Sequence, residues 1–571
     1  MYYRLAIFLA VVVGPHPVCS QRHDSFVASI DGGEAATRNI AKNYRISHID
    51  QVEQVLPQQR KLRVIKNHAF NSLSHSETFS QDNETFTRNG ERSYYWNQKM
   101  KFNDPYLPKQ WYLANKWLNV FAAWSKGFTG KGITAAILDD GIQYDNEDLQ
   151  SNYEPGVSYD VSNLKRKDDD PSPDTSDANR HSHGTYCAAI LSASANNKYC
   201  GVGVAYESKI GGVRLLNGKD SMLTDLQEAL ALSVGSIFQA DIVVSSWGPT
   251  DDGKTIDKPG PMAEKMLKDG VLKGRQGKGT IFVWAVGNGG AKDNCNLDGY
   301  VSSIYTISIN AVTKSGLSCL YDEPCSASMA SVYVGGKHQK HDHVPHNENM
   351  VVPQLDGECI STFQGTSAAA PLAAGIIALM LQANNDLTWR DVQHIIVRSG
   401  RRPGGLHGWK INGAGHPYHH YFGFGTMDAL KAVKLASKWE SVPQHTNFTY
   451  SVPHSPGDVD PEVDSIFRVD IELPNGRSFR TEHVQLHMSL EHEERGTLEM
   501  FLVSPSGTTS QLLTHRPLDV GRTGFQDWSF VSVHFWDENP NGVWKIIISS
   551  SSNTRGSLKN ASITFYGAYY A

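Results

Sequence analysis

Two near-continuous apolar runs, residues 132–138 and 281–286, constrain the fold of this chain more than any other feature. A strand that is buried on both faces of a sheet has such a run, whereas a half-exposed strand alternates apolar and polar residues. From about residue 108 to residue 438, runs of this kind alternate with helical patterns. The alternation predicts an α/β fold with a doubly wound parallel sheet that carries helices on both faces.

Three polar motifs in this region predict a nucleophilic active site. Asp139 ends the first run, at the edge where open parallel sheets place their sites. Ser367 precedes an Ala-, Ile- and Leu-rich segment that predicts a buried helix, with Pro371 in its first turn. A serine hydroxyl becomes nucleophilic when an imidazole takes its proton, and a carboxylate fixes the tautomer of that imidazole. We therefore predict a catalytic triad of Asp139, His183 and Ser367, in the chain order that subtilisin also has.

The second apolar run leads into Asn288, which lies in a Gly-Asn-Gly-Gly sequence. Taken alone, this sequence indicates an Asn-Gly turn. Beside a triad, however, an amide at the end of a strand can donate a hydrogen bond to the oxyanion of the reaction. We therefore predict Asn288 as the oxyanion residue.

The amino terminus predicts entry into the secretory pathway. Arg4 precedes an apolar run at residues 5–13, and small residues follow, so residues 1–20 are predicted to be a signal peptide. Asn83, Asn447 and Asn560 stand in glycosylation sequons that fit this compartment. We expect a protein of the secretory lumen, in the Golgi or secretory granules or outside the cell. No later segment is long and apolar enough to predict a membrane anchor, and the net charge of −6 argues against nucleic acid as a partner.

The 571 residues suggest two to four structural units. Residues 21–92 are polar, with basic clusters at 60–63 and 88–92. From about residue 446, short strands with alternating apolar residues are separated by turn signals, which predicts an all-β sandwich.

Six segments resemble signatures of the proprotein convertases, the kexin- and furin-like branch of the subtilisin superfamily: residues 137–141, 246–249, 251–254, 387–391, 495–498 and 537–540. The resemblance covers nearly the whole chain. It implies a signal peptide (1–20), an inhibitory and chaperoning α+β propeptide (21–92), a subtilisin-like catalytic domain (93–438) and a β-sandwich P domain (446–571). The implied function is that of a Ca²⁺-dependent serine endoprotease that processes secretory precursors and prohormones. It would cleave after paired or clustered basic residues, with arginine at P1, the residue before the cleaved bond. The same resemblance implies a secreted monomer that is inhibited by its own propeptide.

The resemblance also implies an acidic substrate cleft, which an always charged arginine requires. Asp251 and Asp298 would bind P1, and Asp140 would meet P2, the residue before P1. Glu228, Asp257 and Tyr300 would bind P4, and Ser246 and Gly248 would pair with the substrate backbone as an added strand.

Two implied calcium sites consist of oxygen ligands, which suit Ca²⁺: Asp104, Asp148 and Asn197 for the first, and Asp251, Asp293 and Glu323 for the second. A third site, around Asp160 and Asp170, is weakened by Ser172, which stands where the family often has another carboxylate. Sequence alone leaves 15 ways to pair the six cysteines that follow the signal peptide. The resemblance implies Cys200–Cys359 and Cys295–Cys325, with Cys187 free and no implied partner for Cys319.

Several positions depart from the family pattern. Arg180, three residues before His183, would repel a lysine at P2. The propeptide would end at Arg92 with an acid before it, and Arg63, with Arg60 at P4, resembles an inner cleavage site. Two alternatives stay open. One is a pseudoprotease that acts as a binding module or chaperone, to which the poor propeptide site and substitutions after His183 lend weight. The other is a degradative subtilisin of broad specificity, against which the acidic pockets and the P domain argue. A histidine-rich segment from His338 to His346 could bind Zn²⁺ or Cu²⁺, although its composition favours a solvated surface loop.

Overall fold

The computed structural model describes residues 59–66, 101–164, 170–175, 181–218, 220–340, 348–403, 408–453, 457–461, 463–473 and 478–570. The predicted signal peptide, most of the predicted propeptide with its α+β fold, Asn83, Arg92, Arg180 and most of the histidine-rich segment lie outside these residues.

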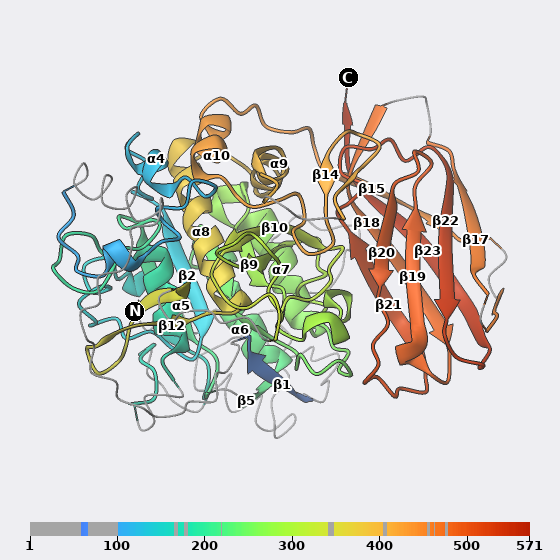
Figure 1. Ribbon diagram of the computed structural model, residues 1–571, viewed down its shortest axis with the longest axis horizontal. Helices are drawn as coiled ribbons and strands as arrows, with labels where there is room; N and C mark the ends of the chain where they lie inside the picture. The colour runs from blue at the N-terminus through green and yellow to red at the C-terminus, as the bar shows by residue number, and fades with distance from the viewer. Residues whose placement is uncertain are drawn as a thin grey trace, which may run out of the picture.

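A seven-stranded sheet forms the centre of the larger unit (Figure 1). Its order is β10 (Ser328–Tyr333), β9 (Thr306–Val312), β8 (Ile281–Ala285), β6 (Ile242–Ser245), β2 (Thr134–Asp139), β4 (Lys209–Arg214) and β3 (Tyr159–Asp160). Every neighbouring pair is parallel. The two apolar runs became β2 and β8, which are buried along nearly their whole length. The prediction of a doubly wound parallel sheet is therefore confirmed.

Helices pack against this sheet in two pairs (Figure 1). One pair is α5 (His183–Ser192) with α8 (Thr366–Ala383), and the other is α6 (Asp225–Ser236) with α7 (Pro261–Lys273). Shorter helices are α4 (Val120–Trp124), α9 (Trp389–Ser399) and α10 (Ala429–Ala436). By length and composition α8 could cross a membrane, but 89% of it is buried and it is the central core helix.

Smaller elements complete this unit. Two short hairpins are β11 (Met350–Pro353) with β12 (Cys359–Phe363), and β13 (Lys410–Ile411) with β14 (Pro417–Tyr418). Single 3₁₀ turns are η2 (Leu107–Lys109), η3 (Pro155–Val157), η5 (Arg275–Gly277), η6 (Gly290–Lys292) and η7 (Cys295–Leu297), and η10 (Arg495–Thr497) lies in the second unit.

A separate three-stranded sheet includes a strand from far upstream in the sequence. Its middle strand, β1 (Arg60–Ile65), pairs antiparallel with β5 (Asp220–Thr224) on one side and with β7 (Trp247–Gly248) on the other. Both neighbours therefore hold β1 through main-chain hydrogen bonds, which do not depend on the side chains of β1.

The second unit is a sandwich of two antiparallel sheets (Figure 1). One sheet has β15 (Thr446–Ser451), β23 (Gly556–Tyr570), β18 (Ser478–Glu491) and β21 (Phe525–Ser532), with β16 (Gly457–Val459) paired to β23. The other has β17 (Ser465–Ile471), β22 (Gly542–Ser550), β19 (Leu498–Val503) and β20 (Thr509–Leu513). The alternating residues Val484, Leu486 and Met488 all point into the sandwich core. The predicted β-sandwich is confirmed.

Buried polar contacts join the two units. Glu482 on β18 accepts hydrogen bonds from Arg390 at 2.8 and 2.5 Å and lies 2.8 Å from Nε2 of His394. The Asn296 side-chain amide donates to main-chain oxygens of Leu512 and Val531 on the sandwich, at 2.8 and 3.3 Å. Because removing one partner of a buried charged pair costs about 3–5 kcal/mol, these contacts fix how the units sit on one another.

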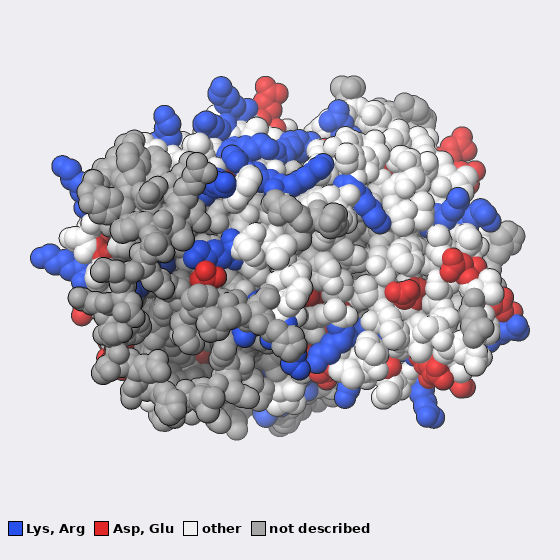
Figure 2. Space-filling model, in the orientation of Figure 1, with Lys and Arg blue, Asp and Glu red and all other residues white. Residues whose placement is uncertain are grey.

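Basic side chains are unevenly distributed over the surface of the molecule. On the face drawn in Figure 2, Lys and Arg side chains gather along the edge above α4 and α10. The exposed lysines there include Lys126, Lys431, Lys434 and Lys438. This basic edge exists although the chain as a whole has a net charge of −6, so the excess of acidic groups lies elsewhere.

Four histidines at or near the interface are buried in their neutral form. Burial lowers the pKa of His420 and of His483 to about 3 and that of His445 to about 4, and it holds the pKa of His534 well below its usual value. The unfolded chain therefore binds more protons than the folded one as the pH falls below 6.5, the ordinary histidine value. Each fully buried histidine then reduces the stability at pH 5 by about 2 kcal/mol.

We predict that the thermal unfolding temperature falls as the pH decreases from about 7.5 to about 5. His534→Gln, which cannot take up this proton, should reduce the slope. His487→Gln is the matched control, because His487 is partly exposed and pairs with Asp527 at the surface; it should leave the slope unchanged. A wild-type unfolding temperature that does not vary over this range would contradict the prediction.

Candidate active site

Two of the three predicted catalytic residues are in direct contact at one edge of the sheet. The thiol of Cys187 lies between them and Ser367, 3.9 Å from Nδ1 of His183 and 3.6 Å from the Ser367 carbonyl oxygen. Asp139 ends β2 and His183 begins α5, and both carboxylate oxygens of Asp139 lie 2.9 Å from Nδ1 of His183. Burial opposes the charged imidazole, but the Asp139 carboxylate outweighs this effect and raises the pKa of His183 well above its usual value. Nε2 of His183 is buried and has no hydrogen-bond partner in the part of the chain that the structure describes. That nitrogen is the atom that a serine-activating base must leave free.

Close backbone packing sets this geometry. A Cβ on Gly184 would lie 2.2 Å from the Gly141 carbonyl oxygen and 2.9 Å from Cβ of Asp139, so α5 can begin this close to β2 only with glycine there. Asp140 accepts hydrogen bonds from the main-chain nitrogens of His183 at 3.2 Å and Gly184 at 2.7 Å. Burial and the neighbouring Asp139 raise the pKa of Asp140 to about 8. The structure thus places Asp140 at the amino end of α5, and the role at P2 that the family resemblance implied stays a prediction.

Ser367 is the second residue of α8, and Pro371 lies in the second turn of that helix instead of the predicted first turn. A proline has no N–H, so the carbonyl of Ser367, four residues earlier, lacks its helical partner. Two other side chains satisfy this carbonyl: Oγ of Ser246 donates to it at 3.1 Å and Sγ of Cys187 at 3.6 Å. The proline is tolerated because neighbouring elements replace the lost hydrogen bond.

The carbonyl of Lys66 lies at Ser367, the predicted nucleophile. Its oxygen accepts a hydrogen bond from the main-chain nitrogen of Ser367 at 3.2 Å, and the Ser367 hydroxyl also contacts it. Oδ1 of Asn288 accepts from the nitrogen and hydroxyl of Thr366 at 3.1 and 3.0 Å, which fixes the orientation of the amide. Nδ2 of Asn288 is buried and unpartnered among the described residues, as a donor reserved for an oxyanion would be.

A buried acidic pocket surrounds the Lys66 side chain. Nζ lies 2.6 Å from Asp298 and 3.5 Å from Asp251, and donates to the Val286 carbonyl oxygen at 3.1 Å. Burial disfavours the ammonium, but these carboxylates outweigh it and raise the pKa of Lys66. Asp251 and Asp298 therefore lie together around one basic side chain, where the sequence placed P1.

A second acidic pocket holds Arg63, which is fully buried. Its Nε lies 2.6 Å from Glu228 and its Nη1 2.7 Å from Asp257, while Nη2 lies 3.4 Å from the Tyr300 hydroxyl. Lys61 extends this contact, with its Nζ 2.7 Å from Asp257. The three residues assigned to P4 thus converge on one guanidinium.

Main-chain contacts set the register between these pockets. The nitrogen of Lys66 donates to the Ser246 carbonyl at 2.9 Å, and Val64 pairs with Gly248. A Cβ on Gly248 would lie 2.6 Å from Cε of Lys66 and 2.6 Å from Oδ2 of Asp298. Both residues predicted to bind an extended backbone contact β1, and Gly248 also leaves space for the Lys66 side chain.

The register bears on one expectation that stays a prediction. Arg63 was expected to precede an inner cleaved bond; in the structure it contacts Glu228, while Lys66 lies against Ser367. The basic cluster at residues 60–63 was identified from the sequence, but Lys66 was missed, because Val64 and Ile65 separate Lys66 from that cluster. Arg63 and Lys66 are three residues apart, the same separation as between P4 and P1, and this spacing could have indicated the role of Lys66.

The first predicted cation site has an unsatisfied oxygen. Oδ1 of Asp148 accepts a hydrogen bond from Asn197 at 2.7 Å, while Oδ2 is buried with no partner among the described residues. Burial raises the pKa of Asp148 to about 8, and burial also raises that of Asp104. A hard cation would satisfy these oxygens, so this donor set fits Ca²⁺.

The second predicted site is a cluster of three acids behind the P1 pocket. Burial raises the pKa of Asp251 to about 6, with Asp293 adding to the rise and Lys66 opposing it. Burial, Asp293 and Asp251 raise the pKa of Glu323 well above its usual value. Arg516 of the sandwich lies 3.1 Å from Asp293. These three buried carboxylates repel one another, and a bound cation would relieve the repulsion, so the set fits Ca²⁺.

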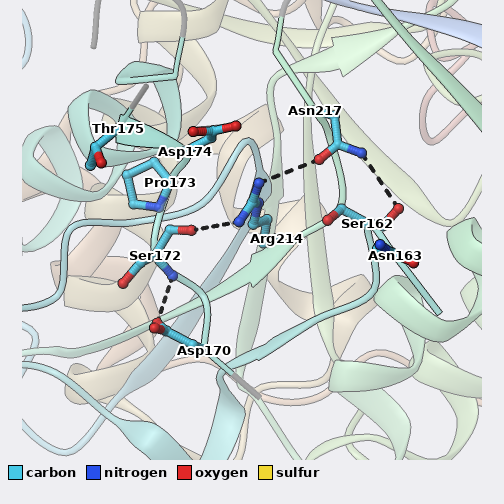
Figure 3. Close-up of a pocket in the computed structure, with 9 residues that line it drawn as sticks. All are labelled: Ser162, Asn163, Asp170, Ser172, Pro173, Asp174, Thr175, Arg214 and Asn217. Carbon is cyan, nitrogen blue, oxygen red and sulfur yellow. Dashed lines mark hydrogen bonds between the residues drawn. The ribbon is translucent and has the colours of Figure 1, made fainter. Parts of the chain in front are cut away.

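The third region contains an arginine. Asp170 and Ser172 line a polar pocket of about 430 Å³ into which Arg214 points (Figure 3). Nη1 of Arg214 donates to the Ser172 carbonyl at 3.2 Å and lies 4.0 Å from Asp160. A guanidinium thus faces this region, and Oδ2 of Asp160 is buried without a hydrogen-bond partner among the described residues; we propose no cation here.

The cysteines pair as the resemblance implied, Cys200 with Cys359 and Cys295 with Cys325. Cys187 and Cys319 are free and buried. Asn447 on β15 and Asn560 on β23 are exposed. Of the histidine-rich segment the structure describes His338, whose Nδ1 lies 2.8 Å from the Ser318 carbonyl.

The comparisons with known proteins agree with this geometry. Residues 130–425, about half of the chain, match the model of the family described as "Subtilase family". The chain belongs to the subtilase family. Residues 481–565 match "Proprotein convertase P-domain", so the recognition of a furin-like proprotein convertase is confirmed.

Curated relatives match most of the chain. Furin of Rattus norvegicus is 44% identical over 474 residues, 81% of this chain and 58% of the relative. Furin-like protease 1, isoform 1-CRR, of Drosophila melanogaster is 43% identical over 477 residues, 82% of this chain and 42% of the relative. Proprotein convertase subtilisin/kexin type 6 of Homo sapiens is 42% identical over 492 residues, 82% of this chain and 49% of the relative. The chain thus spans about half the length of these relatives.

A solved structure has the same fold. A serine protease of Aeromonas sobria superposes with a TM-score of 0.71 at 22% sequence identity, covering 82% of this chain and 96% of that one. At this identity the match shows the fold alone.

Gly248→Ala tests how the P1 pocket holds Lys66. The added methyl group would overlap both Lys66 and Asp298, so we predict faster amide hydrogen exchange across residues 59–66 in the intact chain, by about tenfold or more. Gly156→Ala is the control, because its added methyl group would approach only the flexible, partly exposed side chain of Glu154. Equal exchange in both variants would contradict the role given to Gly248.

Proposed function

We propose that this chain is a Ca²⁺-dependent serine endoprotease that processes secretory precursor proteins by cleaving after basic residues. The contact between the chain's own β1 and the active site carries the proposal. Two basic side chains of this segment occupy two buried acidic pockets, and the carbonyl after the second one contacts Ser367. A peptide substrate would bind in the same way.

Each catalytic group has a defined role in this proposal. Nε2 of His183 takes the proton of the Ser367 hydroxyl as it attacks the carbonyl carbon, and Asp139 stabilises the resulting imidazolium. The main-chain nitrogen of Ser367 and Nδ2 of Asn288 donate hydrogen bonds to the oxyanion. His183 then returns the proton to the leaving amine, and water hydrolyses the acyl-enzyme.

The acidic pockets determine the substrate class. Arg63 and Lys66 are each at least 99% buried, so each carboxylate around them faces a desolvated cation. Losing one such partner would cost a few kcal/mol, which favours basic residues steeply over apolar ones. This argues against a degradative protease of broad specificity, and the intact triad argues against a pseudoprotease.

Residues 21–92 act, in this proposal, as a propeptide that inhibits residues 93–438, and residues 446–571 are the P domain. The strand β1 supplies the inhibition, because it fills the cleft that substrates need. The two disulfides and the exposed sequons at Asn447 and Asn560 support an oxidising, secretory compartment.

Calcium would be held by Asp104, Asp148 and Asn197 and by Asp251, Asp293 and Glu323. Bound there, it would neutralise buried carboxylates and supply no covalent chemistry. The first of these sites stabilises the catalytic unit in the proposal, and the second keeps Asp251 ionised beside P1.

A fluorogenic Arg-x-Lys-Arg peptide tests the function. The wild-type protein should hydrolyse it, Ser367→Ala should abolish hydrolysis, and Asn288→Ala should reduce kcat by about 10²–10³-fold with little change in KM, because the amide acts on the oxyanion. Hydrolysis that persists in Ser367→Ala, or that is equally fast with leucine at P1, would contradict the proposed function.

Calcium should raise the thermal unfolding temperature. At a Ca²⁺ concentration about 100-fold above Kd the stabilisation is about 2.7 kcal/mol per site. Asp148→Asn should lose much of this rise, because it removes a charged, buried ligand. Glu147→Gln is the matched control, an exposed acid at the preceding position that should respond as the wild type does. An unfolding temperature that is the same in Ca²⁺ and in chelator would refute the calcium sites.

A further inference from the structure

A hollow lies between α10 and the loop that follows α4, away from the predicted active site. Its volume is about 440 Å³. One wall of the hollow is held by Gln382 near the end of α8, whereas Ser367 lies at the start of that helix. At about 1.5 Å per residue, the two ends are roughly 22 Å apart. A ligand in the hollow would therefore leave the cleft open.

Hydrogen bonds fix the walls of this hollow. Asn119, which precedes α4, donates from Nδ2 to Asp428, which precedes α10, at 3.1 Å. Beyond α4, Oε1 of Gln382 accepts from the main-chain nitrogen of Thr129 at 2.6 Å and so holds the loop that carries Phe128. Because these contacts exist without a ligand, binding in the hollow would require little reordering of the protein.

The floor of the hollow is apolar and recessed. Val433 is buried, and Phe128 and Leu430 are half-buried. Among the described residues, none of the large apolar side chains that are exposed belongs to this lining. A protein that inserts into the surface of a bilayer does so with protruding apolar side chains. Here the protein offers a recess instead, so the ligand must supply the apolar group.

Lysines surround this floor. Lys126, Lys434 and Lys438 are exposed and belong to the basic edge that Figure 2 shows. Within the described part of the chain, none of the three forms an ion pair. Lys434 and Lys438 are four residues apart, a spacing at which like charges repel one another. The carbonyl ends of α4 and α10 favour lysines nearby, but this effect does not explain the apolar floor that the lysines surround.

We propose that this hollow docks a peptide segment of a partner protein in which one apolar side chain is flanked by carboxylates. The apolar side chain fills the recess over Phe128, Leu430 and Val433, and the carboxylates pair with the lysines of the rim. An amphipathic helix in a groove presents its groups in this way. A fatty acid has one carboxylate for three lysines, so it matches the rim less well. The inference is independent of the proposed protease function, because it concerns binding at the other end of α8.

Acidic peptides test this docking site on the intact chain. The probe is a pool of short peptides of Asp and Glu with one Leu or Phe at the centre, and the matched pool has Ala there. By fluorescence anisotropy we expect members of the first pool to bind, and replacement of the central residue by Ala should raise Kd by about tenfold or more. A first pool without any binding peptide, or equal affinity for both pools, would overturn the proposal.

Two variants separate the charged rim from the apolar floor. Lys434→Ala should raise Kd by about fivefold or more, since it removes a cation that faces the ligand. Lys268→Ala is the matched control, an exposed lysine of α7 outside the hollow, and it should bind as the wild type does. Ser437→Phe places a ring in the hollow at an exposed lining position without changing the charge, and it should also weaken binding. Unchanged thermal unfolding temperatures would show that the variants fold.

Equal Kd values for Lys434→Ala and Lys268→Ala, or for Ser437→Phe and the wild type, would overturn the docking site. Vesicles of phosphatidylserine and phosphatidylcholine test a membrane surface as the occupant. Adsorption to these vesicles that is tighter than peptide binding and is lost in Lys434→Ala would overturn the proposal in favour of a membrane. Bound peptide should leave hydrolysis of Arg-x-Lys-Arg unchanged. Inhibition that Lys434→Ala does not relieve would place the peptide in the cleft and would also overturn the proposal.

Discussion

The hydrogen bonds to the carbonyl of Ser367 hold α8, α5 and Ser246 in place around the active centre. Pro371 removes the helical N–H that would bond to this carbonyl. The hydroxyl of Ser246 and the thiol of Cys187 take its place. Ser246 also supplies the carbonyl that binds the substrate strand, and Cys187 lies one turn after His183. The Ser367 carbonyl, which lacks a partner within its own helix, thus connects α8 with α5 and with Ser246 in the wall of the cleft.

The electrostatics of the cleft follow from burial. Surface acids would attract basic peptides weakly and in a salt-dependent way. Here Glu228 and Asp298 are buried, so each gains most when an equally buried cation faces it. The bound β1 provides two such cations. Under the proposed function, a bound substrate would reproduce this charge balance, and release of β1 would leave carboxylates that need another cation.

The sequence predicted the parallel sheet well, for a physical reason. A doubly buried strand has little choice of composition, so the runs around Ile137 and Val283 identified β2 and β8. The site at the carboxyl ends followed from the parallel topology. Side-chain direction was harder to predict. Asp140 neighbours Asp139 in sequence but turns to the amino end of α5, because the helix N–H groups there need acceptors.

The sequence also missed contacts between distant segments. Lys66 lies outside the basic cluster, and its role appears only when β1 pairs with β7. Arg516 lies in the sandwich, more than two hundred residues from its partner Asp293. Neither position carries a local motif. Both depend on three-dimensional register, which periodicity and spacing do not determine.

The Arg516–Asp293 contact has a consequence for how this protein can be shortened. Asp293 belongs to the acidic cluster behind the P1 pocket, and the sandwich contributes a cation to that cluster. A chain cut before residue 446 would lose this positive charge as well as the interface. Its pocket would hold the same carboxylates with one fewer counterion. The sandwich is therefore part of the electrostatic environment of the cleft.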